Sequence, residues 1–324
     1  MWRTVGHERV QRFLQRALAQ DALGHAILFT GPAAVGKWTL ALDLTAALLC
    51  EVQPNDPCWE CIQCKGVARL QHPDLHLVEL EEGRRSIRME QVAALQQAVA
   101  LRPYQAVQRV SVILDAHLLQ PEASQRLLKT LEEPPAHNTL ILTASSTHLM
   151  PQTLLSRCQV WRLTGLPRRL VQSELERRGV SQPDAAFLAA ASLGRMGWAI
   201  AASMDPELRE REESLVRLLI QTLRADRASR MELIDHLLDD VSDIDRLFDL
   251  WSEWWRSFLL VQAGVSDHDS DNRPAMGHDV ELSISPQEAV SVIKRIDEAR
   301  EWVRANVNVR LALETLALHL PEAS

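Results

Sequence analysis

The stretch Leu28–Thr39, LFTGPAAVGKWT, decides the fold of this 324-residue chain. It reads as a buried strand, a glycine-rich turn and the start of a helix, with Gly31, Gly36 and Lys37 at the spacing of a phosphate-binding loop. In such a loop the backbone N–H groups surround a phosphate and the lysine reaches its oxygens. Working ATPases carry a Ser or Thr hydroxyl for Mg²⁺ at the next position, where this chain has Trp38. The sequence therefore predicts the geometry of the loop and leaves open whether ATP or ADP binds.

A second element of the same kind of site follows the apolar run Val110–Leu114. Asp115 stands at its end, where a metal-side carboxylate belongs, but Ala116 occupies the position of the glutamate that orients the attacking water. The chain thus lacks two groups of a working site, the Mg²⁺-binding hydroxyl at Trp38 and the water-orienting carboxylate at Ala116. We therefore expect that any bound ATP is not hydrolysed efficiently.

Four of the five cysteines are clustered with the spacing C-x₇-C-x₂-C-x₂-C, after the helix that follows the phosphate-binding loop. They are Cys50, Cys58, Cys61 and Cys64. Four thiolates satisfy tetrahedral Zn²⁺ and leave no open coordination position, so we predict a structural zinc module over residues 50–64. An iron–sulfur cluster or unrelated buried thiols are the alternatives. His72 and His76 are interpreted as structural, because four cysteines already complete the shell.

The overall composition is that of an ordinary globular protein with a net charge of −8. This charge argues against a chain that holds nucleic acid by bulk electrostatics alone. The sequence contains no apolar run of about 18 residues, so no membrane span is expected, and its charged N-terminal residues lack the apolar core of a signal peptide. The default location is therefore cytoplasmic, where clustered cysteines favour metal over disulfides.

Short apolar runs alternate with helical patterns through the first half of the chain, which predicts a parallel sheet with helices on both faces. Strands are expected at 25–30, 75–80, 110–114, 139–144 and 159–163, and helices at 8–23, 37–49, 89–100, 121–133 and 151–156. After Leu163 the patterns are helical, with one group of helices before Asp205-Pro206 and another after it. Tryptophans at 251–255 fall on an apolar stripe and are interpreted as core residues, and a polar loop is expected at 264–279.

One arginine follows the short helix at 151–156, in the tripeptide Ser156-Arg157-Cys158 just before the fifth strand. A lone arginine is usually a solvated surface residue. At this edge of the sheet, however, Arg157 could be offered to the γ-phosphate of a neighbouring subunit as an arginine finger. The pattern by itself does not assign that role.

The combined motifs resemble the bacterial DNA polymerase III clamp-loader subunits, which are AAA+ proteins. The segments that carry the resemblance are GPAAVGK, the four-cysteine insert, HPDLHLVE, LLKTLEEPP at 127–135 and SRC at 156–158. They cover most of residues 1–205, whereas the rest matches in helical pattern and length. The resemblance implies an α/β AAA+ domain with the zinc module at 1–165, a three-helix lid at 166–204 and an all-α collar at 205–324.

Within this family the chain looks like the delta-prime subunits and not like the gamma/tau motors. The motors carry Thr after the loop lysine, Asp-Glu in the second element and an arginine in the lid. At these places the chain has Trp38, Asp115-Ala116 and Gly197, and Arg195 lies two residues before the last of them. The resemblance therefore implies a non-hydrolysing stator subunit that helps to load the sliding clamp during DNA replication.

The resemblance also implies the partners and the roles of the site residues. The expected partners are the gamma/tau and delta subunits, the sliding clamp and, through the assembly, primed DNA. Arg157 would act in trans as the catalytic residue at the ATP site of an adjacent gamma/tau subunit. The chain's own nucleotide site would be vestigial, and its residues are Gly31, Gly36, Lys37 and Asp115.

Two other functions are weighed against this one. An active ATPase of the gamma/tau type would need Mg²⁺ held through water or through Thr39, and turnover abolished by Lys37→Ala would reveal it. A zinc-dependent DNA-binding module would need basic residues around the cysteines, where only Lys65 and Arg69 are near.

Overall fold

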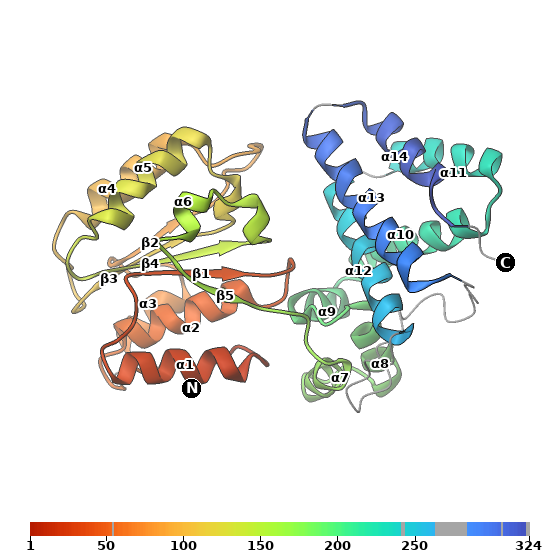
Figure 1. Ribbon diagram of the computed structural model, residues 1–324. Helices are drawn as coiled ribbons and strands as arrows, with labels where there is room; N and C mark the ends of the chain where they lie inside the picture. The colour runs from red at the N-terminus through yellow and green to blue at the C-terminus, as the bar shows by residue number, and fades with distance from the viewer. Residues whose placement is uncertain (54, 241–243, 263–283, 306, 322–324) are drawn as a thin grey trace. The chain divides into compact units, whose positions relative to one another are not determined.

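The computed structural model describes residues 1–53, 55–240, 244–262, 284–305 and 307–321 (Figure 1). The polar loop expected at 264–279 lies outside these described residues. The chain divides into two compact units, Met1–Gly165 and Leu166–Ser324. Every strand of the described residues belongs to the first unit, and the described part of the second unit is helical.

The first unit is built on a sheet of five parallel strands in the order β2-β3-β4-β1-β5. The strands are β1 Ala26–Thr30, β2 Leu75–Val78, β3 Arg109–Ile113, β4 Asn138–Ala144 and β5 Gln159–Arg162. β1 lies between β4 and β5, with Leu28 opposite Leu142 and Val160. All residues of β1, β3 and β4 are buried, as expected where helices cover both faces of a parallel sheet. The prediction of an α/β fold with a parallel sheet is confirmed.

Helices cover both faces of this sheet, and side chains that alternate along β1 enter different cores. On one face lie α1 Glu8–Ala19, α2 Lys37–Leu49 and α3 Ile62–Ala68, and on the other α4 Met89–Val99, α5 Pro121–Glu132 and α6 Gln152–Leu155 (Figure 1). Ile27 and Phe29 belong to the first core, whereas Ala26 and Leu28 belong to the second. Because the strands are parallel, their carboxyl ends meet at one edge, where the loops with candidate site residues begin.

In the first unit, two of the expected elements end two or more residues early, and one helix was not expected. The first helix ends at Ala19, because Asp21 takes a left-handed conformation (φ 51°) that an α-helix does not contain. β2 ends at Val78, whose register partner Ile113 is the last residue of β3. The helix α3 was not expected, because its central Gly66 lowers helix propensity.

The second unit consists of helices in its described part. They are α7 Arg168–Arg177, α8 Gln182–Ala191, α9 Met196–Met204, α10 Pro206–Arg224, α11 Arg227–Asp240, α12 Ile244–Gln262, α13 Pro286–Arg304 and α14 Val309–Leu318. Trp251 and Trp255 of α12 are fully buried in its core, which confirms their interpretation as core residues. Within the described ranges, no helix combines the length and apolar character needed to cross a membrane. The division into a lid at 166–204 and a collar at 205–324 stays a prediction.

Candidate functional site

The phosphate-binding loop has the backbone geometry that its sequence predicts. β1 ends at Thr30, and α2 begins at Lys37 with Gly36 as its N-cap in a left-handed conformation (φ 111°). At Gly31 (φ 149°) an added Cβ atom would lie 2.2 Å from the carbonyl oxygen of Leu163, so only glycine fits beside the chain that leaves β5. The N-terminus of α2 thus opens towards the loop, an arrangement that favours an anion.

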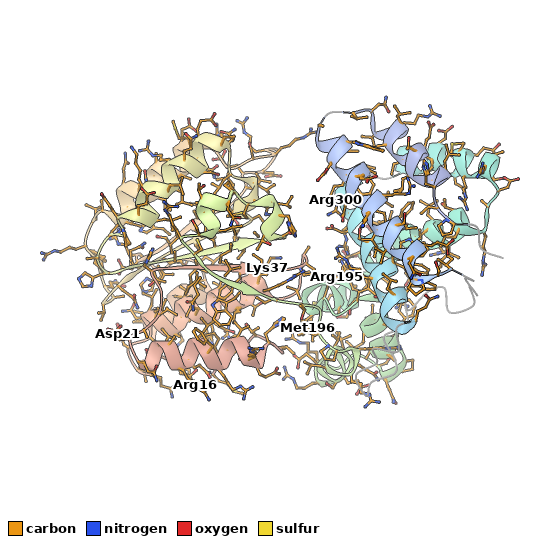
Figure 2. The ribbon with its side chains drawn as sticks, in the orientation of Figure 1. Arg16, Asp21, Lys37, Arg195, Met196 and Arg300 are labelled. Carbon is orange, nitrogen blue, oxygen red and sulfur yellow. The ribbon has the colours of Figure 1, made fainter. Side chains whose placement is uncertain are left out.

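Lys37 is buried at the base of this loop, in the first turn of α2 (Figure 2). Its ammonium donates to the carbonyl oxygens of Gly31 and Pro32, both at 2.7 Å, and the residue is 8% exposed. Trp38 is half-buried and packs against the core on the α2 face of the sheet, while Thr39 is exposed. The indole therefore contributes to the core and offers no oxygen ligand to Mg²⁺.

Asp115 lies at the same edge of the sheet, two residues after β3. Its side chain is exposed, and its backbone N–H donates to the Thr143 hydroxyl at 2.9 Å. Ala116, by contrast, is buried. Sequence reasoning missed His117 and Ser145, whose side chains lie 3.1 Å apart at this edge. Their positions shortly after two strands of a parallel sheet are the signal that could have found them.

The four clustered cysteines come together as a candidate metal centre. Their sulfur atoms all lie within 4.8 Å of one another, and the residues are Cys50, Cys58, Cys61 and Cys64. The sulfurs of Cys58 and Cys64 are 3.9 Å apart. Tetrahedral zinc with Zn–S bonds of about 2.3 Å requires sulfurs separated by about 3.8 Å, so the measured spacing fits. The fold therefore brings the predicted ligands together, and these four cysteines could hold a metal ion, consistent with zinc.

Backbone amides point at the sulfur atoms of this cluster. Three N–H groups donate at 3.3 Å, from Gln53 to Cys50, from Cys61 to Cys58 and from Cys64 to Cys61. The N–H of Cys61 is the main reason that the pKa of the Cys58 thiol falls to about 6. Burial acts in the opposite direction at Cys64 and raises the pKa of its thiol. Such donors favour the thiolate form, which is the form that binds metal.

A buried hydrogen-bond chain supports the cysteine cluster. His72 Nδ1 accepts the backbone N–H of Asp74 at 3.0 Å, so Nε2 carries the proton and donates to Gln63 Oε1 at 2.6 Å. The Gln63 amide donates in turn to Glu51. Both ring nitrogens of His72 are thus engaged by the protein, and the chain joins two segments that stand next to cysteines of the cluster.

Asp74 is a buried carboxylate whose role sequence reasoning missed, although it stands inside the motif HPDLHLVE. Its oxygens accept the backbone N–H groups of Tyr104 (2.6 Å), Gln105 (2.8 Å) and Ala106 (2.9 Å), and one of them lies 3.5 Å from Arg109 Nε. Burial alone would raise the pKa of Asp74, but the three amides and Arg109 hold it below its ordinary value. The carboxylate therefore anchors the loop between α4 and β3.

Arg157 lies in the turn between α6 and β5, where the sequence places the candidate finger. Its Nη1 donates to the carbonyl of Thr153 at 2.9 Å and to the hydroxyl of Ser156 at 3.3 Å. Its Nη2 forms an ion pair of 2.7 Å with Glu132, the last residue of α5. The side chain is 35% exposed, so the guanidinium is held in place yet reachable from solvent. The adjacent Cys158 is a poor nucleophile, because burial raises the pKa of its thiol to about 11.

In the second unit, Arg195 is held by its own neighbours. It stands at the N-cap of α9, beside Met196, and is 1% exposed (Figure 2). Its Nε donates to the carbonyl of Ser192 at 2.8 Å, and its guanidinium lies over the ring of Trp198, 5.4 Å from the centroid. These contacts give Arg195 a packing role in this unit.

Comparisons with known proteins find a family model, relatives and a solved structure that this chain resembles. A family model described as "DNA polymerase III, delta subunit" matches residues 6–167. The subunit delta′ of DNA polymerase III from Bacillus subtilis is 27% identical in an alignment of 321 positions that covers 97% of this chain and 96% of that protein. The tau subunit from the same organism is 36% identical over 156 residues, which are 48% of this chain but only 27% of tau. A gamma subunit-related protein of Thermotoga maritima aligns in structure with 96% of this chain and 97% of its own, at 18% identity and a TM-score of 0.45.

Proposed function

This chain belongs to the DNA polymerase III delta subunit family, and we propose that it is a delta-prime-type subunit of the clamp loader that does not itself hydrolyse ATP. Similarity to a delta-prime subunit over nearly the whole of both proteins supports this choice within the family. The proposed partners are the gamma/tau and delta subunits, with the sliding clamp and primed DNA reached through the assembly. A cytoplasmic location follows from that role.

The observation that carries the proposal is the placement of Trp38. A working site needs a hydroxyl directly after the loop lysine, and this position instead holds an indole packed against the core. The neighbouring residues do not supply the missing groups. Thr39 is exposed to solvent, and Ala116 is buried where a water-orienting carboxylate would be needed. Lys37, meanwhile, donates to carbonyls of its own loop. Such a loop could bind ATP or ADP, but it would not hydrolyse ATP efficiently.

The chemistry proposed for this chain takes place at the site of a neighbouring subunit, through Arg157. A guanidinium that reaches a γ-phosphate stabilises the negative charge that develops in phosphoryl transfer. The bonds to Thr153 and Ser156 fix the arginine head beside α6, and its exposed side leaves it available to a partner. α5, α6 and the turn before β5 serve as the support of that one group.

The four-cysteine cluster is proposed to hold structural Zn²⁺. All four sulfurs are needed for a tetrahedral shell, so no position is left for a substrate or for a catalytic water. When bound, the metal would supply folding free energy to the segment that joins α2 to α3.

The test uses the reconstituted assembly of this chain with gamma/tau and delta subunits. Arg157→Ala is expected to leave assembly intact and to slow hydrolysis at the adjacent site by roughly 10³-fold or more, as arginine fingers do where they act. The total rate of ATP hydrolysis by the assembly then falls by the fraction that the site next to Arg157 contributes. Arg12→Ala, which removes an exposed arginine on α1, is the matched control. An unchanged rate with Arg157→Ala would refute the proposed role of the arginine.

A further inference from the structure

We propose that Glu132 is the positioning residue for Arg157 and that its carboxylate stands in for the neighbouring subunit's phosphate until that phosphate arrives. The inference rests on the proposed function of Arg157 as a finger acting in trans. It concerns a contact within this chain, the ion pair of 2.7 Å between Arg157 Nη2 and Glu132 Oε1.

The ion pair joins two elements that pack together. Glu132 ends α5, and Arg157 follows α6, which packs against α5. The opposite side of the guanidinium is held by the local turn, through the carbonyl of Thr153 and the hydroxyl of Ser156. The arginine head therefore has two neutral acceptors from its own turn and one anionic acceptor from another helix. Only the anionic acceptor resembles a phosphate oxygen in charge and in hydrogen-bond geometry.

The exposure of the pair makes it exchangeable. The side chains of Arg157 and Glu132 are 35% and 51% exposed, so water screens their attraction. The buried pair of Asp74 and Arg109 shows the contrast, because its side chains are 0% and 8% exposed and neither charge could leave without a large penalty. A phosphate carries more negative charge and more acceptor oxygens than one carboxylate, so it replaces a screened carboxylate at an arginine.

This exchange has a kinetic signature. While ATP is absent from the neighbouring site, the carboxylate competes for the guanidinium, and binding of ATP must break the ion pair. Glu132→Gln keeps the size of the side chain and removes its charge. The KM for ATP at the neighbouring site should then fall about 1.5- to 5-fold, which is the free energy of an exposed ion pair expressed as a change in affinity. The value of kcat should not change, because the ion pair with Glu132 is already broken in the ATP-bound state from which the transition state is reached.

The experiment measures ATP hydrolysis against ATP concentration in the reconstituted assembly. Four variants of this chain are compared: Glu132→Gln, Glu133→Gln, Arg157→Ala, and Glu132→Gln combined with Arg157→Ala. Glu133 is the matched control, because it is the adjacent carboxylate and makes no ion pair with Arg157 in the described structure. We expect the lower KM with Glu132→Gln alone, no change with Glu133→Gln, and no effect of Glu132→Gln in the Arg157→Ala background.

The outcomes separate this inference from the function on which it rests. If Arg157→Ala slows hydrolysis but Glu132→Gln leaves KM unchanged, the finger stands and the role of Glu132 is refuted. A lower kcat with Glu132→Gln, or the same fall in KM without Arg157, would also refute it, since the carboxylate would then act on packing and not through the arginine. If Arg157→Ala has no effect, both proposals fail. Thermal unfolding of each variant checks that the exposed substitutions leave the fold intact.

Discussion

Replacing Asp74 by alanine is expected to destabilise the first unit strongly, although the residue lies outside the proposed nucleotide and metal sites. The carboxylate is fully buried, accepts three backbone N–H groups and pairs with the nearly buried Arg109. Its removal leaves those amides without their acceptor and a guanidinium without its counter-charge. Removing one partner of a buried ion pair costs about 3–5 kcal/mol of folding free energy. The unit could lower this cost only by moving the loop at 101–108.

The loss should be visible as a lower melting temperature. For a unit of this size, about 3–5 kcal/mol corresponds to a fall in Tm of roughly 6–20 °C. Asp74→Asn keeps the shape and one acceptor oxygen, so its fall should be smaller. Scanning calorimetry of the full chain, with Glu82→Ala as an exposed acidic control, measures both.

The same carboxylate predicts how stability depends on pH. In the folded chain its pKa lies below the ordinary value of 3.8, so the unfolded chain binds the proton more readily. The stabilisation by Asp74 is therefore fully present above about pH 4 and is lost as the pH falls through the lower, folded pKa. Asp74→Asn should lack this part of the acid dependence. A fall in Tm no larger than that of Glu82→Ala, or an unaltered acid dependence, would show that Asp74 does not anchor the loop.

The remaining predictions concern the metal and the chain's own nucleotide site. Elemental analysis should find about one zinc per chain, lost in Cys64→Ser, and iron or no metal would overturn the assignment. Phosphate release by the isolated chain should stay at background with and without Lys37→Ala, because Trp38 and Ala116 replace the groups for Mg²⁺ and water. DNA-stimulated release that Lys37→Ala abolishes would contradict the proposed non-hydrolysing role.

The features that sequence could predict are those set by neighbouring residues in the chain. The glycines and lysine of the phosphate-binding loop act through local backbone geometry, and the cysteine spacing places four sulfurs within one short segment. The alternation of strands and helices likewise follows from local apolar patterns. β2 was predicted too long, because the end of a strand depends on its partner, and here β3 ends opposite Val78.

The features that sequence could not predict join residues far apart in the chain. The acceptors of Asp74 are backbone amides, which any residue type supplies, so no side-chain pattern marks them. The pair of Glu132 and Arg157 depends on how α5 packs against α6, and LLKTLEEPP and SRC carry no signal that they meet. His117 and Ser145 come from the ends of two different strands, so only the parallel order of the sheet, and no local motif, indicates that they meet.

The close approach of Gly31 to the carbonyl of Leu163 limits what the loop motif indicates about ATPase activity in a sequence. With no room for a Cβ atom, this position admits only glycine for as long as the chain leaves β5 along its present path. Selection for a well-packed sheet is then enough to retain the first glycine of the signature in lineages that never use ATP. A pattern search that takes this glycine as evidence of ATPase activity would assign a catalytic meaning to a residue that packing alone explains. Positions 38 and 116, where this chain has Trp and Ala in place of the hydroxyl and the glutamate of a working ATPase, are better places to look for the capacity to hydrolyse nucleotide.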